Sequence, residues 1–350
     1  MTAMDSRADR TPAPADVDRY EHEAVPDPAI EATDLVKRYD DVVAVDGVSL
    51  RVPRATIFAY LGRNGSGKTS TVRMLTTLSV PSAGTARVAG HDIADAARVR
   101  AHIGVTMQEA ALDPAMTATE HLRLVAGLSG LRSSAAEVLA GELLDTFGLA
   151  DAANRRIGTF SGGMQRRLDI ATALIGQPPV LFLDEPTTGL DPQSRRALWA
   201  HIRTLREQGT TVFLTTQYLE EADELADRVA IIDRGAIIAE DTPEALKARL
   251  GRTRVVFDHD GGAERVRAVL AGRDVEADGH GRSVVALDAD PSNGSEGAQV
   301  LALLEQVRGA GIGIEALSVS APSLEDVYLR VTGSAITTGQ DQITDPEGQP

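Results

Sequence analysis

The sequence predicts an α/β fold organised around a mostly parallel sheet, followed by a smaller α+β domain. Three short apolar segments are typical of strands buried on both faces of a sheet, namely PPVLFLDEP (178–186), TTVFLTT (210–216) and RVAIIDRG (228–235). A fourth apolar segment, TIFAYLG (56–62), leads into a glycine-rich turn, which is typical of a strand–loop–helix unit. In the region 252–333, the segments follow the order β-α-β-β-α-β, which predicts a small split-βαβ domain.

The elements before residue 160 are predicted from periodicity and capping patterns. AVDGVSLRV (44–52) reads as a strand, and TVRMLTTL (71–78) has apolar residues at helical spacing. Between about 109 and 160 the pattern is helical. Capping boxes are expected at Thr117–Glu120 and at Ser134–Glu137, each at the start of a helix.

The end of the larger domain is marked by TPEALKARLG, in which Thr242 is an expected N-cap and Pro243 the first helical residue. Gly251 is expected just past the end of this helix. Within the smaller domain, DADPSNGSEG (288–297) is expected to be an exposed loop.

These patterns divide the chain into four parts. The larger domain is expected to span 30–251, with an inserted helical subdomain at about 109–178, and the accessory domain follows it. The tails at 1–29 and 334–350 are rich in Pro, Asp, Thr or Gln and poor in apolar residues, so we expect them to be disordered.

Composition excludes several classes of function. The formal charge of −16 argues against a general nucleic-acid binder, which needs a basic face. The chain has no apolar run near the ~20 residues that a membrane span requires, and its start has no signal-peptide pattern. Zero cysteines exclude disulfides and thiolate metal sites and are compatible with the cytoplasm.

The glycine-rich turn GRNGSGKT fits the phosphate-binding pattern G-x-x-x-x-G-K-[ST] and lies between a predicted strand and a predicted helix. Its backbone N–H groups and the helix N-terminus are suited to phosphate oxygens. Lys68 can reach the β- and γ-phosphates, and the Thr69 hydroxyl can ligate Mg²⁺. The candidate nucleotide-binding residues here are Gly62, Arg63, Asn64, Gly65, Ser66, Gly67, Lys68, Thr69 and Ser70.

A second candidate site lies at the end of the strand VLFLDEP. Two carboxylates at the end of an apolar strand are costly unless something positive meets them. With a phosphate loop in the same chain, Asp184 is expected to hold Mg²⁺ and Glu185 to orient or deprotonate an attacking water.

A third motif, TFSGGMQRRLDIATALIG, places Ser161, Gly162 and Gly163 at the start of a predicted helix. Small residues at a helix N-terminus suit a second approach to phosphate. Two such helix ends in one chain suggest that one of them serves the nucleotide of a neighbouring copy.

Along the chain the order is the phosphate loop, Gln108, SGGMQRRL, LFLDEP and TGLD (188–191), and this order resembles that of the ATP-binding subunit of an ABC transporter, over about residues 30–250. The resemblance implies a P-loop NTPase core of ABC type and a ferredoxin-like accessory domain. It also implies ATP and Mg²⁺ as ligands, a homodimer of ATP-binding domains, and a separately encoded permease at the cytoplasmic face of the membrane. Tyr39 would stack on adenine, Gln108 would contact Mg²⁺ and the permease-facing subdomain, and Asp191 would lie at the dimer seam. The face that contacts the permease would include 109–130.

Gln217 follows the strand TTVFLTT, where the family usually has a histidine that senses the γ-phosphate. Glutamine can donate a hydrogen bond to phosphate but cannot become a cation. We therefore expect active but slower ATP hydrolysis, without a histidine step in its pH profile.

Three features are similar to the daunorubicin-resistance branch of drug-export ATPases: Met164 after the two glycines, TTQYLEEAD, and the ending PSLEDVYLRVTG. Export of a drug-like compound is implied by this resemblance alone. Arg63 stands where the family often has proline, and Ala55-Thr56 replaces a common Gly–acid pair. Neither change removes a phosphate contact.

Alternative functions are less consistent with the motifs. A soluble ABC-type ATPase for DNA repair needs a long coiled-coil insertion, and the spacing of 184 − 68 = 116 residues is too short for one. The translation type normally carries two cassettes, whereas this chain has one phosphate loop. A P-loop kinase or GTPase does not account for SGGMQRRL. A purely regulatory module stays open if Glu185 is catalytically silent, which an ATPase assay decides.

Overall fold

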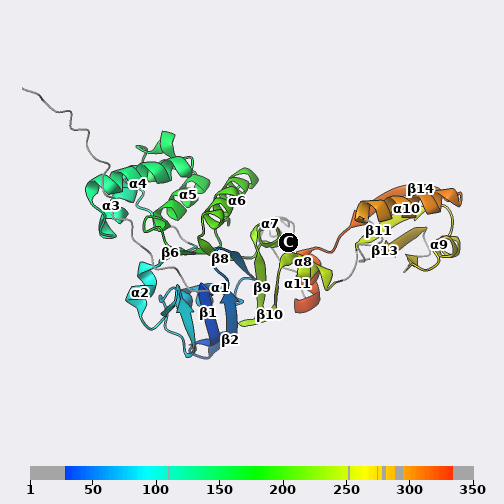
Figure 1. Cartoon of the computed structure of the whole chain (residues 1–350), viewed down its shortest axis with the longest axis horizontal. Coiled ribbons are helices and arrows are strands. Elements are labelled where there is room, and N and C mark those ends of the chain that lie inside the picture. The colour runs from blue at the N-terminus through cyan, green and yellow to red at the C-terminus, as the bar shows by residue number, and fades with distance from the viewer. Residues whose placement is uncertain are drawn as a thin grey trace, which may run out of the picture.

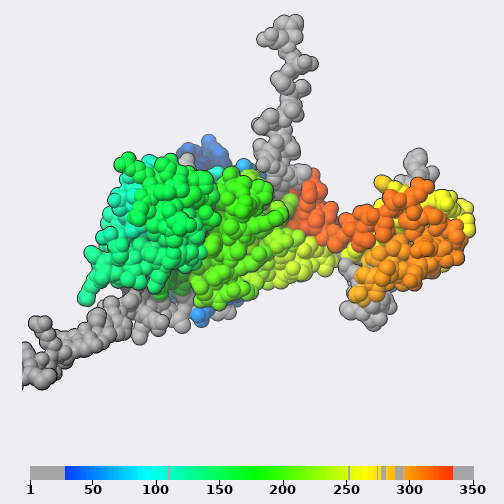
Figure 2. Space-filling model, turned by 90° about the horizontal axis from the view of Figure 1, so that it is seen from above, coloured from blue at the N-terminus to red at the C-terminus, as the bar shows by residue number. Residues whose placement is uncertain are grey.

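A computed structural model describes residues 28–333 except 109–110, 251–252, 274, 278–280 and 288–294. The expected disordered tails lie outside the described residues, apart from residues 28 and 29. Ala29 is buried and its N–H donates to the Val52 carbonyl, so ordered structure begins just before the expected boundary. The chain forms a larger lobe and a smaller one, which Figures 1 and 2 show joined by a narrow connection.

The larger lobe is built on a six-stranded sheet with the order β10-β9-β3-β8-β7-β6. All neighbouring pairs are parallel except β9 and β10, so β10 is an antiparallel edge. Every residue of β7 and β8 is buried, as are the four central residues of β9, which confirms the prediction of strands covered on both faces. β3 is also buried throughout. The strands are β3 (Ile57–Leu61), β6 (Ile103–Thr106), β7 (Val180–Asp184), β8 (Thr211–Thr216), β9 (Arg228–Asp233) and β10 (Ala236–Asp241).

This sheet separates two hydrophobic cores. Because side chains alternate along a strand, Ala59 of β3 faces one core and Phe58 and Tyr60 face the other. The second core is closed by α1 (Lys68–Leu75), α2 (Ala96–Ala101) and an antiparallel sheet with the order β2-β1-β4-β5. The strands of that sheet are β1 (Ile30–Tyr39), β2 (Val42–Val52), β4 (Ala83–Val88) and β5 (His91–Asp92).

The first core is covered by helices, which Figure 1 shows on the opposite side of the sheet from β1 and β2. Trp199, the single tryptophan of the chain, lies in this core. The elements on this side are α3 (Ala118–Leu128), α4 (Ser133–Thr146), η1 (Ala150–Ala152), η2 (Ile157–Thr159), α5 (Gly162–Ala173), α6 (Pro192–Glu207), α7 (Leu219–Leu225) and α8 (Pro243–Ala248).

Of the two expected capping boxes, only the first forms. Thr117 and Glu120 bond each other's backbone N–H at the start of α3, which confirms that prediction. The box at Ser134–Glu137 is wrong: α4 begins at Ser133, and its N-cap makes no side-chain bond. Glu137 instead forms an ion pair of 2.8 Å with Arg123 of α3, so its carboxylate joins two helices rather than capping one.

The smaller lobe has the predicted β-α-β-β-α-β order and a four-stranded antiparallel sheet ordered β12-β13-β11-β14. Its two helices enclose a separate core that includes Phe257 and Leu303. The elements are β11 (Arg254–His259), α9 (Ala263–Val269), β12 (Val275–Ala277), β13 (Arg282–Ala286), α10 (Glu296–Gly309) and β14 (Ile314–Ser320).

The last helix, α11 (Leu324–Thr332), returns to the larger lobe. Leu324, Val327 and Tyr328 join the core that contains Leu246 of α8 and Leu225 of α7. The segment predicted as one accessory domain therefore contributes to both lobes. Among the described residues, no helix is both long and apolar enough to span a bilayer.

Tyr328→Ala is expected to destabilise the larger lobe by about 3–5 kcal/mol, the usual cost of deleting a buried aromatic ring. Tyr328 is fully buried, whereas the neighbouring Leu329 is 38% exposed. Urea unfolding followed by Trp199 fluorescence measures the effect. Leu329→Ala is the matched control and should change the free energy of unfolding by less than about 1 kcal/mol. Equal effects of the two substitutions would contradict the packing of α11 on the larger lobe.

Candidate functional site

The candidate phosphate loop connects β3 to α1, and three of its glycines are required by geometry. Gly65 and Gly67 have φ values of 78° and 106°, which disfavour any residue with a Cβ atom. A Cβ atom on Gly62 would lie 2.6 Å from the Ile232 carbonyl oxygen, and one on Gly67 would lie 2.4 Å from the Ala44 carbonyl oxygen. The loop therefore keeps its backbone close to its neighbours. Asn64 and Gly65 are exposed, whereas Arg63, Gly67, Thr69 and Ser70 are half-buried.

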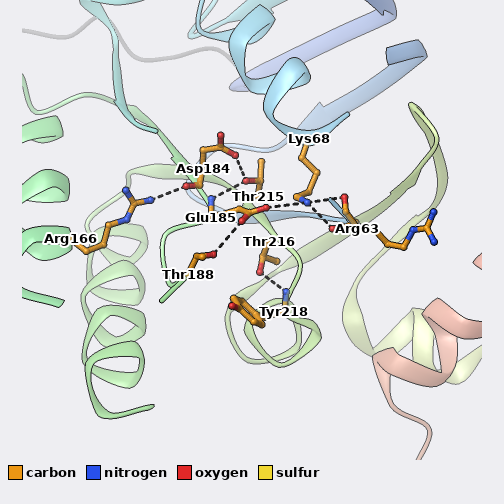
Figure 3. Close-up of polar contacts among 10 residues, drawn as sticks. Arg63, Lys68, Arg166, Asp184, Glu185, Thr188, Thr215, Thr216 and Tyr218 are labelled. Carbon is orange, nitrogen blue, oxygen red and sulfur yellow. Dashed lines mark hydrogen bonds and ion pairs between the residues drawn. The ribbon is translucent and has the colours of Figure 1, made fainter. Parts of the chain in front are cut away.

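Lys68 is buried at the base of this loop (Figure 3). Its ammonium donates to the carbonyls of Gly62 (2.8 Å) and Arg63 (3.1 Å) and lies 3.2 Å from the Glu185 carboxylate. Burial lowers the pKa of Lys68, and the negative charge of Glu185 opposes this shift. The lysine predicted to reach phosphate and the acid predicted to act on water thus form a buried ion pair.

Asp184 and Glu185 lie at the end of β7, beside β8. The Thr215 hydroxyl donates to one carboxylate oxygen of Asp184, and the other oxygen, Oδ2, is buried without a hydrogen-bond partner among the described residues. Glu185 has a φ of 48°, an uncommon conformation for a residue other than glycine. Its N–H donates to Thr215, and its carboxylate accepts from the Thr188 hydroxyl at 3.2 Å.

Gln217 directly follows β8 and is 9% exposed. The ends of β3, β8 and β7 are neighbours, because Leu61 pairs with Thr216, and Thr215 pairs with Asp184. The structure therefore brings together the strand ends that carry the phosphate loop, the two acids and Gln217.

Tyr39 and Gln108 are more exposed than this buried group. Tyr39 is the last residue of β1, 44% exposed, and the Lys37 ammonium lies over its ring, 5.0 Å from the centroid. Gln108 is exposed shortly after β6 ends.

The Ser161-Gly162-Gly163 segment begins α5, and the Ser161 hydroxyl accepts from the Met164 N–H. A Cβ atom on Gly163 would lie 2.7 Å from the Ser194 hydroxyl of α6, so glycine permits close packing of the two helices. Asp191 is the N-cap of α6 and accepts from both the N–H and the hydroxyl of Ser194. Within the described parts of the chain, no hydrogen bond joins the α5 tip to the phosphate loop.

Arg166, the sixth residue of SGGMQRRL, is a further residue of the site that the motifs did not indicate. This buried arginine of α5 donates to three backbone carbonyls, those of Met107 (2.7 Å), Asp184 (2.9 Å) and Pro186 (3.0 Å). Two adjacent arginines in a helix that is otherwise packed against the core were the available signal, because an arginine is rarely buried without partners.

Glu221 was also missed, although it lies in the segment TTQYLEEAD. It is fully buried, and the Trp199 indole N–H donates to its Oε1 at 3.1 Å. Burial raises the pKa of Glu221 above its usual value. Glu221 anchors α7, which follows Gln217, to α6, which follows Asp191.

Replacing the Glu221 carboxyl with an amide is expected to increase the free energy of unfolding by an amount that depends on pH. Because its pKa is higher in the folded state, Glu221 loses stabilising influence as pH rises from its unfolded pKa through its folded pKa. Glu221→Gln keeps an acceptor for Trp199 but does not ionise. We expect the variant to gain stability relative to the parent as pH rises above the ordinary pKa of a glutamate, because the raised pKa of Glu221 penalises only the parent there; urea unfolding at a series of pH values measures the difference. A difference that is constant with pH would contradict a buried, titrating carboxyl.

The chain is similar to known proteins over most of its length. The sequence model of the ABC transporter family matches residues 45–188. The chain is 45% identical to the daunorubicin/doxorubicin resistance ATP-binding protein DrrA of Streptomyces peucetius over 317 residues, covering 88% of this chain and 93% of the relative. It is 43% identical to the doxorubicin resistance ATP-binding protein DrrA of Mycobacterium tuberculosis, covering 83% and 89%.

The Nod factor export ATP-binding protein I of Burkholderia orbicola is 37% identical, covering 87% of this chain and 97% of the relative. Among solved structures, an ATP-binding subunit of an ABC transporter superposes with a TM-score of 0.58 at 28% identity, covering 63% of this chain and 93% of that one. With 45% identity over 88% of its length to one such subunit, the chain belongs to the family of ABC transporter ATP-binding subunits.

Proposed function

We propose that this chain binds and hydrolyses ATP to drive export of a drug-like or hydrophobic compound through a separately encoded permease. ABC ATPases hydrolyse ATP, and this chain is a member of that family. The observation that supports the assignment most strongly is the buried Lys68–Glu185 pair of 3.2 Å, because it combines a phosphate-binding cation with a candidate base.

The phosphate loop and Tyr39 would bind the nucleotide. The backbone N–H groups from Gly62 to Ser70 suit the phosphate oxygens, and Lys68 would exchange its loop carbonyls and Glu185 for phosphate. Tyr39 would stack on the adenine ring, which its exposed position at the end of β1 permits.

Glu185 would accept a proton from the attacking water, and Gln217 would hold the γ-phosphate or that water by hydrogen bonds. Because Gln217 is neutral at all physiological pH values, we expect no histidine step in the pH profile of turnover. Unchanged turnover in Gln217→Ala would contradict its proposed contact with the γ-phosphate.

The residues present fit a magnesium ion. Asp184 Oδ2 is buried without a hydrogen-bond partner among the described residues, which is costly for a carboxylate unless a cation meets it. Thr69, Gln108 and Asp184 would hold the ion, directly or through water. Mg²⁺ would neutralise charge on the phosphates when bound.

A second copy of the chain would complete each nucleotide site. Ser161, Gly162 and Gly163 at the tip of α5 would approach the γ-phosphate bound by the partner, and Asp191 would lie at the seam. Ser194 links the α5 tip to Asp191 within one chain. Its hydroxyl donates to the Asp191 carboxylate and packs so close to Gly163 that a Cβ atom there would lie 2.7 Å away.

The transport role is supported by what the relatives do, since their names describe drug resistance and Nod factor export. The permease would dock on the helical subdomain, including the described residues 111–130, at the cytoplasmic face of the membrane. The net charge of −16 argues against nucleic acid as a partner.

The test is ATP-driven uptake of doxorubicin into inverted vesicles that contain this chain and the membrane protein encoded beside it. We expect uptake only when both proteins and ATP are present, and none with Glu185→Gln. ATP turnover with neither uptake nor co-purification of the membrane protein would favour a soluble ABC-type ATPase without a transport role.

A further inference from the structure

Arg166 lies where the helical subdomain meets the catalytic strand. It belongs to α5, whose N-terminal tip carries Ser161-Gly162-Gly163, and it is 7% exposed. Figure 3 shows its guanidinium directed at the end of β7, the strand that carries Asp184 and Glu185.

All three nitrogens of the guanidinium donate hydrogen bonds. Nε donates to the Pro186 carbonyl, Nη2 to the Asp184 carbonyl, and Nη1 to both the Met107 carbonyl and the Asp169 carboxylate. A lysine could not reproduce this arrangement, because its donors diverge from a single atom. The contacts therefore require arginine rather than positive charge alone.

Asp169 balances the charge of Arg166 from the next turn of α5, at 3.0 Å. It also accepts a hydrogen bond from the backbone of Ala111. Burial raises the pKa of Asp169 to about 6, although the charge of Arg166 opposes this shift. The pair thus lets a cation remain buried against the three backbone carbonyls.

Those carbonyls belong to residues next to the proposed catalytic groups. Asp184 and Pro186 flank Glu185, whose φ of 48° must be held by its surroundings. Met107 directly precedes Gln108. Arg166 touches neither the carboxylate of Glu185 nor the amide of Gln108, so any effect on them passes through the backbone.

We infer that Arg166 is a positioning residue that ties the α5 tip, offered to the partner's nucleotide, to Glu185 and Gln108 of its own chain. This inference rests on the proposed ATPase function. When the α5 tip binds the partner's nucleotide, Arg166 then transmits the movement of α5 to Glu185 and Gln108, which belong to the nucleotide site of its own chain. Displacing a reacting group by about 1 Å can reduce a rate 100-fold, so the backbone bonds are sufficient for a large effect.

The test compares two variants of the full-length chain. Arg166→Met combined with Asp169→Asn removes the carbonyl bonds without leaving a buried unpaired charge. Asp169→Asn alone keeps Arg166 and its three carbonyl bonds, and is the matched control. Steady-state ATPase kinetics, the melting temperature, and ATP-dependent pairing in a Glu185→Gln background are measured for each.

We expect kcat of the double variant to fall roughly 10- to 100-fold below that of Asp169→Asn, with KM for ATP changed less than about threefold. Its melting temperature should stay close to that of the control, because the loss of donors to three carbonyls is offset by removal of the buried cation that Asp169→Asn leaves without its carboxylate. ATP should still pair its Glu185→Gln form, because the phosphate loop and the α5 tip are intact. A kcat equal to that of the control would overturn the inference. So would a parallel change in kcat, KM and melting temperature, since that pattern marks a merely structural role.

If the double variant does not fold, Arg166→Lys tests the same point, because it keeps the charge beside Asp169. It should lose turnover without losing ATP binding, and parental turnover in this variant would overturn the inference. Absence of ATP turnover in the parent chain would instead contradict the proposed function, so the two failures are distinguishable.

Discussion

Glu185→Gln is expected to reduce ATP turnover roughly 10²- to 10⁴-fold, the usual contribution of a general base, while leaving ATP binding intact. Glutamine has the same shape, and its one amide oxygen can still accept one of the two contacts that Lys68 and Thr188 make to different oxygens of Glu185. It cannot accept a proton from water. The effect should therefore appear in kcat, measured by phosphate release, and not in the affinity for a fluorescent ATP analogue.

The same variant tests the two-copy arrangement. When hydrolysis is blocked, bound Mg-ATP should hold two chains together, and light scattering coupled to size exclusion should detect a dimer that disappears without ATP. Glu207→Gln, an exposed acid at the end of α6, is the matched control and should behave like the parent. Parental turnover in Glu185→Gln would remove Glu185 from the mechanism. A protein that binds no ATP and never pairs would contradict the whole proposal.

The features that could be predicted from the sequence are those formed by residues close together in the chain. The phosphate loop, Asp184 and Glu185 lie in short contiguous motifs, whose geometry is set by the strand, the glycines and the helix that follow one another in the chain. Their convergence with Gln217 follows from parallel strand order, because carboxyl ends of neighbouring strands meet at one edge of the sheet. Lys68 and Glu185 are accordingly found together.

Contacts between distant segments were not predictable in the same way. Arg166 joins Met107, 59 residues earlier, to Asp184, 18 residues later, and no local pattern specifies that pairing. In α11, the apolar spacing of Leu324, Val327 and Tyr328 indicates a buried face, but not which lobe buries it. Ser134 and Glu137 fit a capping box, yet the ion pair with Arg123 takes the glutamate elsewhere.

Lys68→Met is expected to weaken ATP binding about 10- to 100-fold, since a hydrogen bond to a charged group contributes about 1.5–3 kcal/mol. Turnover should fall further, because the same ammonium would stabilise charge that develops on the transferred phosphoryl group. Titration with a fluorescent ATP analogue measures the first effect and phosphate release the second. Arg73→Met, which removes an exposed cation from the last turn of the same helix, is the matched control and should leave both unchanged.

Because Lys68 also forms an ion pair with Glu185, Lys68→Met has a second measurable effect, on the stability of the nucleotide-free protein. Lys68→Met leaves Glu185 buried without its cation, so the nucleotide-free variant should lose thermal stability. Lys68→Met combined with Glu185→Gln removes both charges, and we expect it to regain most of that stability without regaining ATP affinity. Recovery of both properties would mean that Lys68 serves only to balance Glu185. Recovery of stability alone would mean that Lys68 binds phosphate, because neutralising Glu185 cannot replace the ammonium that donates to the phosphate oxygens.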